Sequence, residues 1–100
     1  MKPYILGRTA EQDSMEILDY LTNHEGLDRA IHVHDAFLRA FELLAESPGI
    51  GARSRLLPGN FRRWRVYNYF VLYDAESAPL RITRIVHGAR DLTTVFGHED

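Results

Sequence analysis

The chain has 100 residues, of which 45% are hydrophobic and 26% charged, and this composition is typical of one globular domain. It contains no cysteine, which excludes disulfides and thiolate metal sites, and no apolar run approaches the roughly 20 residues that span a membrane. We therefore expect a single domain over residues 1–100, located in the cytoplasm and without a membrane partner.

The net charge of -2 conceals two halves of opposite character. Residues 1–52 contain four basic and nine acidic side chains, whereas residues 53–100 contain eight arginines and five acids. A forked guanidinium group binds carboxylates and phosphates through paired hydrogen bonds, so the second half favours an acidic protein or a nucleic acid as partner. Arginines on the outer face of a sheet also serve solubility alone, and at this point both interpretations stay open.

The first quarter of the chain predicts a short strand followed by a helix. Residues 3–7 have the character of a strand, and Thr9 with Gln12 fits a capping box at a helix start. Apolar residues at helical spacing then place the helix over Ala10 to Asn23. Gly26 suits the positive backbone torsion that closes a helix.

A longer helix follows, with apolar residues at three- and four-residue spacing from Leu27 to Ala45. The segment 47–51 contains a proline and two glycines, which end the helix and allow positive torsions. Two consecutive helices with a tight joint make a helical hairpin.

From Phe61 the pattern changes to the aromatic and β-branched residues that are typical of strands. We expect strands over 61–66 and 69–73 with a tight turn at 67–68, a third strand over 80–87, and a short C-terminal helical turn over 91–96. The predicted class is α+β: a strand, a helical hairpin and a three-stranded antiparallel meander (βααβββ), with the hairpin covering one sheet face. The other face is then partly bare. The candidates to line it are Arg63, Arg65, Tyr67 and Tyr73.

The sequence offers no motif for a metal or a cofactor, and we expect neither. His32 and His34 lie two residues apart in a helix and therefore point to different sides. What remains is the arginine set and the segment 87–91. A histidine and an arginine at a strand end suit phosphate cleavage, with Arg90 holding the phosphate and His87 moving protons. They also suit a structural turn at Gly88, with Arg90 bonding a helix end or Asp91, and the residues alone leave this open.

Three segments, in this order and spacing, are similar to the RelE/ParE superfamily of bacterial type II toxins: 44–51, 61–73 and 82–91. The helix end Ser-Pro-Gly-Ile-Gly and the strand end Val-His-Gly-Ala-Arg-Asp look like the ParE branch. The resemblance covers nearly the whole chain. It implies the βααβββ fold, a hetero-oligomer with a cognate antitoxin that wraps the toxin, and contact with operator DNA only through that antitoxin.

The resemblance also implies two kinds of target. ParE-type toxins poison DNA gyrase without being enzymes, whereas the ribonuclease branch cuts ribosome-bound messenger RNA with arginines and a terminal tyrosine. Arg65 and Arg90 occupy positions that look equivalent to those arginines, but the tyrosine position is Phe96 and the basic position before Arg90 is Ala89. These departures favour the gyrase inhibitor.

Two alternatives stay open beside it: a nuclease, with Arg65, His87 and Arg90 as catalytic residues, and a non-toxic corepressor that acts with its antitoxin. For the gyrase inhibitor we expect no catalytic residue. The residues expected to bind the antitoxin or the target are the arginines and aromatics of the strand region, namely Arg62, Arg63, Trp64, Arg65, Tyr67, Tyr73, Arg84 and Arg90.

Overall fold

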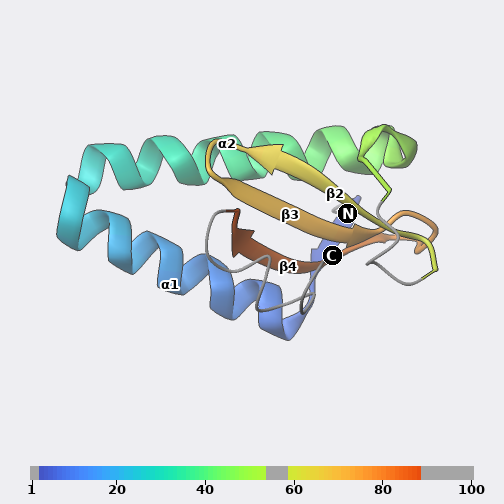
Figure 1. Ribbon diagram of the computed structural model, residues 1–100, viewed down its shortest axis with the longest axis horizontal. Coiled ribbons are helices and arrows are strands. Elements are labelled where there is room, and N and C mark those ends of the chain that lie inside the picture. Colours follow the sequence, from blue (N-terminus) through green and yellow to red (C-terminus); the bar gives the residue numbers. More distant parts are fainter. Residues whose placement is uncertain (1–2, 54–58, 89–100) are drawn as a thin grey trace, which may run out of the picture.

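The computed structural model describes residues 3–53 and 59–88 and has the predicted order of elements (Figure 1). The elements are β1 (Tyr4–Leu6), α1 (Arg8–Glu25), α2 (Leu27–Glu46), the 3-10 turn η1 (Pro48–Ile50), β2 (Phe61–Val66), β3 (Tyr69–Asp74) and β4 (Leu80–His87). The α+β class and the βααβββ order are thus confirmed. The helical turn expected over 91–96, together with Arg90, lies outside the described residues.

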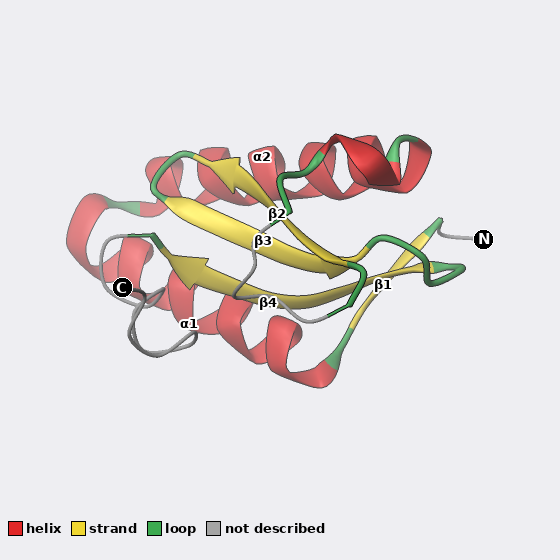
Figure 2. Cartoon of the chain, turned by 45° about the vertical axis from the view of Figure 1, so that its right-hand side comes forward, coloured by secondary structure: helices red, strands yellow, loops and turns green. Residues whose placement is uncertain are grey.

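The four strands form one sheet in the order β1-β4-β3-β2. The last three form the expected antiparallel meander, whereas β1 pairs in parallel with β4 along Leu80 to Ile82 alone. Figure 2 shows the sheet as one layer and the two helices as the other. The outer edge of β4 beyond Ile82 consequently has no neighbouring strand within the described part of the chain.

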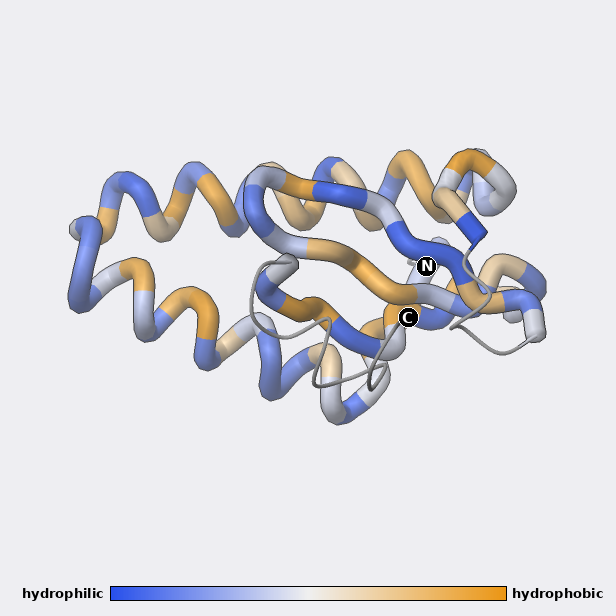
Figure 3. The backbone as a smooth tube through the Cα atoms, in the orientation of Figure 1, coloured by the Kyte–Doolittle hydropathy of each residue, from blue (hydrophilic) through white to orange (hydrophobic). Residues whose placement is uncertain are grey.

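The core lies between the helical hairpin and the inner face of the sheet. The α2 side chains Phe37 and Leu44 are fully buried, and they belong to the same cluster as Val71, Tyr73 and Ile82 of the strands. Hydrophobic positions recur along both helices and concentrate in β3 and β4, as Figure 3 shows. The burial of these apolar side chains is the main force that holds the two layers together.

The capping box predicted at Thr9 and Gln12 is wrong. The helix begins at Arg8, with Gly7 as its N-cap residue and no side-chain cap. The reason is that the Gly7 N–H donates to the Ile82 carbonyl at 2.9 Å, which fixes the end of β1 and leaves the helix to start at once. At the other end α1 reaches Glu25, two residues further than predicted.

The joint between the helices is a single residue. Gly26 has φ of 96°, which confirms the predicted positive torsion, and it is the C-cap residue of α1 and the N-cap residue of α2. A side chain rarely adopts this torsion, so glycine lets the hairpin close without a longer loop.

The connector after α2 is held by Tyr73, which is fully buried on the inner sheet face. Its hydroxyl donates to the Pro48 carbonyl at 2.6 Å and accepts from the Gly51 N–H at 2.9 Å. A Cβ on Gly51 would collide with this hydroxyl, so the glycine is required for space and not for a positive torsion, its φ being -69°. The expectation that Tyr73 lies on an open surface is therefore wrong.

Removing that hydroxyl by Tyr73→Phe should destabilise the protein by about 1–3 kcal/mol, because it leaves the buried Gly51 N–H without its acceptor. Urea unfolding measures the difference. Tyr20→Phe, at an exposed tyrosine, serves as the control and should shift stability by less than about 0.5 kcal/mol. Equal stability of the two variants would contradict the assigned role of Tyr73.

Candidate functional site

The sheet face away from the helices carries two arginines next to apolar side chains. The strand register sets Arg65 opposite Phe70 and Arg63 opposite Leu72, so all four share this face. The Arg63 guanidinium lies 5.1 Å from the centroid of the Phe70 ring. The exposed Arg65 donates from Nε to the Tyr67 carbonyl at 2.8 Å. We call Arg63, Arg65 and Phe70 the cationic face.

The other predicted residues of β2 alternate to the inner side. Trp64 lies opposite Val71 and packs against the core cluster. Arg62 lies opposite Tyr73 and donates to the Gly51 carbonyl at 2.8 Å. The structure therefore divides the predicted set between two faces, and Arg62 and Trp64 have contacts that support the fold.

Tyr67, in the turn between β2 and β3, combines an unfavourable backbone with an exposed ring. Its φ is 54°, in the left-handed region that costs a non-glycine residue about 1–2 kcal/mol. The Arg29 guanidinium lies 4.9 Å from the ring centroid and the His32 ring 6.2 Å, so α2 supports the side chain from below. The side chain is still 41% exposed. A two-residue hairpin turn requires a positive φ, so this torsion closes the turn between β2 and β3 and holds the ring at its tip.

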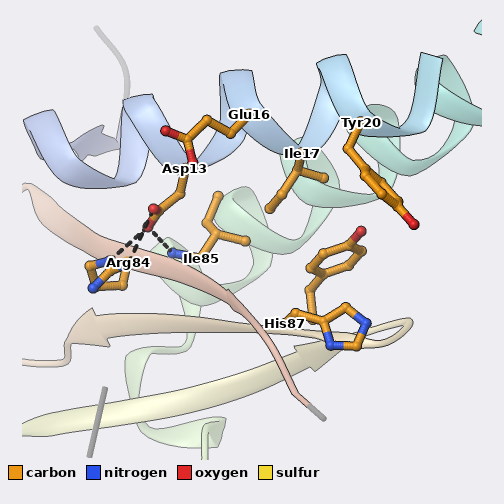
Figure 4. Close-up of a pocket in the computed structure, with 8 residues that line it drawn as sticks. Asp13, Glu16, Ile17, Tyr20, Arg84, Ile85 and His87 are labelled. Atoms are coloured by element: carbon orange, nitrogen blue, oxygen red, sulfur yellow. Dashed lines mark hydrogen bonds and ion pairs between the residues drawn. The ribbon is translucent and has the colours of Figure 1, made fainter. Parts of the chain in front are cut away.

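A pocket of about 370 Å³ lies between α1 and the outer edge of β4 (Figure 4). Within it the Asp13 carboxylate accepts hydrogen bonds from Arg84 Nε at 2.8 Å, from Arg84 Nη2 at 3.2 Å and from the Ile85 N–H at 2.9 Å. Asp13 thus supplies the acceptor that a further strand would have given to Ile85. Arg84, predicted as a binding residue, is engaged with α1.

Sequence reasoning missed Asp13 altogether. It is one of several acids in a helix, and its partner Arg84 follows 71 residues later, a separation that carries no local pattern.

The three residues of the nuclease alternative meet only in part. Arg65 and His87 border the same pocket of about 420 Å³ at the turn end of the sheet, together with Phe70. The His87 ring stands edge-on to Tyr69 at 5.5 Å between centroids. The third residue, Arg90, is not described. Across 3–53 and 59–88 there is no group of three or more histidine or acidic side chains that is placed to hold a metal ion.

Charge is sorted by layer. The helices α1 and α2 carry nine acidic residues and three arginines, whereas β2, β3 and β4 carry five arginines and one aspartate. The helical layer is thus acidic, and Arg63 and Arg65 of the sheet present cations on the opposite side of the domain. Arg62 and Arg84 turn instead toward the connector and α1.

The chain is thus a small α+β protein with a helical hairpin on one face of a four-stranded sheet and arginines on the other face. The protein-family model that describes the ParE toxin of the type II toxin–antitoxin system parDE matches residues 4–92. Toxin ParE1 of Caulobacter vibrioides is 30% identical over 97 residues, which cover 97% of this chain and all of that protein. A solved structure of the chromosomal ParDE system from P. aeruginosa matches with a TM-score of 0.73 at 18% identity, over 84% of this chain and 92% of that one.

The chain therefore belongs to the ParE family of type II toxins, as the sequence resemblance implied. Membership of a toxin–antitoxin family implies a cognate antitoxin as partner. Of the helices in the described residues, neither is both long and apolar enough to cross a membrane.

Asp13→Ala should lower the free energy of unfolding by about 2–3 kcal/mol, because it removes the ion pair with Arg84 and the acceptor of the Ile85 N–H together. The Ile85 amide should then exchange its hydrogen faster than its neighbours in β4, as measured by NMR. Arg84→Ala should lower the free energy of unfolding by less and leave the Ile85 amide protected, because Asp13 can still accept its hydrogen bond. A protected Ile85 amide in Asp13→Ala would show that Asp13 is dispensable at this edge.

Proposed function

We propose that this protein is a ParE-type toxin that arrests growth by inhibiting DNA gyrase in the cytoplasm, without being an enzyme itself. The observation that carries the proposal is membership of the ParE family over residues 4–92. Two sequence features support it against the ribonuclease branch. Phe96 lacks the hydroxyl of the terminal tyrosine of that branch, and Ala89 lacks the positive charge that the branch has before the position of Arg90. The antitoxin neutralises the toxin as a hetero-oligomer and carries the contact with operator DNA.

The surface proposed for the antitoxin or the target is the cationic face. Tyr67 extends it around the turn end of the sheet to the helical side, where its ring lies over Arg29 of α2. These side chains are accessible, and the guanidinium groups suit carboxylates on a disordered acidic segment that folds as it binds. Phe70, which stacks under Arg63, provides apolar area beside the charges. Arg84 and Arg90 stay in the proposed set, Arg84 through its partly exposed guanidinium.

The gyrase assignment predicts that purified toxin blocks supercoiling of relaxed plasmid by gyrase. Induction of the chain alone in bacteria should relax plasmids and leave messenger RNA intact. Supercoiling and message integrity are measured in one culture. Cut messages with normal supercoiling would replace the proposal by the nuclease alternative, which the shared pocket of Arg65 and His87 favours. Absence of growth arrest would instead point to the corepressor.

The role of the cationic face is tested by charge reversal. Arg65→Glu should weaken antitoxin binding by about tenfold or more, since one favourable charge contact becomes a repulsive one. Arg39→Glu, an identical change at an exposed residue of the helical layer, is the matched control and should bind as the unaltered chain does. Isothermal titration with the cognate antitoxin measures both. If the two variants lose affinity equally, net charge and not the cationic face determines binding.

A further inference from the structure

A small pocket of about 230 Å³ lies where the connector after α2 passes the start of β2 and the turn after β3. This end of the sheet is opposite to the turn that holds Tyr67 (Figure 1). Two arginines, Arg53 and Arg62, and the amide side chain of Asn60 border the pocket. The residues of the cationic face do not border it. The pocket is therefore a second cationic site, separate from the first.

Each of the two arginines is positioned by one hydrogen bond to a backbone carbonyl. Arg53 donates from Nη2 to the Gly59 carbonyl at 3.1 Å, and Arg62 donates from Nη1 to the Gly51 carbonyl at 2.8 Å. A guanidinium group has five N–H donors, so most of the donors of both groups stay available to a ligand. Because the carbonyls already hold the two side chains in place, a ligand has less side-chain freedom to restrict when it binds.

The positive charge of this arginine pair is not balanced by a carboxylate in the described part of the chain. The ion pairs there are made by Arg29 and Arg84. Glu76 borders the same pocket, but it forms no ion pair with either arginine; its N–H donates to Asp74 Oδ1 at 3.0 Å, within the turn after β3. Like charges that share one pocket repel each other, and an anion between them relieves that repulsion.

The size of the pocket and the kind of its donors indicate which anion it binds. Pockets for a drug-sized ligand have about 300–1,000 Å³, so a pocket of about 230 Å³ fits a small ion or one chemical group of a larger ligand. Guanidinium groups bind phosphate through paired hydrogen bonds, and the Asn60 amide adds a neutral donor. A phosphate offers oxygens to donors from three directions, whereas a carboxylate offers only two oxygens in one plane.

We propose that this pocket binds a phosphate group, held by Arg53, Arg62 and Asn60. The phosphate is either a free ion or part of a nucleic-acid backbone, because both present the same anionic oxygens. The carboxylate of Glu76 at the border limits the affinity by repulsion. The inference depends neither on gyrase being the target nor on the role of the cationic face.

Arg62 connects the pocket to the segment that Tyr73 holds. It donates to the carbonyl of Gly51, whose N–H donates to the Tyr73 hydroxyl. Burial raises the pKa of Tyr73, whereas its hydrogen bond with Gly51 and then the charge of Arg62 lower it, so this charge is felt at the hydroxyl. A phosphate that binds the folded chain stabilises it. The Gly51 amide should consequently exchange its hydrogen more slowly when phosphate is bound.

The test titrates inorganic phosphate into the purified full chain and follows the backbone amides by NMR. The amides of Gly51, Asn60 and Glu76 should shift in a saturable manner. Arg53→Gln, at an exposed residue, should weaken binding by about tenfold, because a charge-assisted contact is lost. Arg39→Gln removes the same charge from an exposed position of the helical layer and is the matched control. It should bind phosphate as the unaltered chain does.

Glu76→Gln tests the assigned repulsion from the opposite direction. It should tighten phosphate binding by about threefold, because a negative charge leaves the border of the pocket. If Glu76 instead neutralises the arginines in solution, Glu76→Gln should lower the melting temperature and leave the phosphate affinity unchanged. That result would mean that the chain itself supplies the anion, and it would overturn the proposal.

A short thymidine oligonucleotide is the second probe, and it separates the two sources of phosphate. Tighter binding of inorganic phosphate supports a free ion as ligand, whereas tighter binding of the oligonucleotide, with the same loss in Arg53→Gln, supports a nucleic-acid backbone. Binding that is lost in Arg65→Gln and retained in Arg53→Gln would place the anion on the cationic face and overturn the proposal. Absence of binding with both probes would overturn it as well. Thermal unfolding confirms that each variant is folded.

Discussion

The structure depends on one constraint: a two-helix layer can cover only one face of a sheet, so the main apolar core lies between that face and the helices. Phe37, Phe41 and Leu44 of α2 meet this requirement from one side, and Val71 and Ile82 meet it from the other. Because α1 also lies along the free edge of β4, a single carboxylate, that of Asp13, can replace a missing strand. The second sheet face carries Arg63 and Arg65 beside the apolar Phe70 and Leu72.

The sheet itself is adapted to this arrangement by one irregularity. The register of β3 and β4 shifts between Leu72 and Tyr73. In a regular strand Ile82 and Ile85 would point to opposite faces, since they are three residues apart. The shift instead allows both to enter the core cluster. Periodicity of two in the sequence could not reveal this, because the irregularity follows from the pairing of two strands and not from either strand alone.

The sequence predicted those features that depend on interactions between residues close together in the chain. The bounds of β2 and β4 agree with the prediction, because aromatic and β-branched runs end at polar turns, and Gly26 was recognisable by its place between two helical patterns. The error at Thr9 arose from a contact between Gly7 and a strand 75 residues later. Tyr73 was misjudged for the same reason: its partner Pro48 is distant in sequence, and only folding brings the two together. The contact between Arg84 and Asp13 could not be predicted from the sequence on the same ground.

Within the described residues, the acidic helices and the outward-facing Arg63 and Arg65 lie on opposite sides, a separation of charge that the net charge of -2 does not reveal. A molecule with acidic helices on one side and guanidinium groups on the other experiences a torque in the field of a charged neighbour. The molecule is therefore oriented before contact, so that its side of complementary charge faces the neighbour when the two meet. Rotational search of this kind limits the association rate of most proteins, and an oriented dipole shortens it in a manner that salt suppresses. The arrangement of charge therefore bears on the rate of association as much as on its strength.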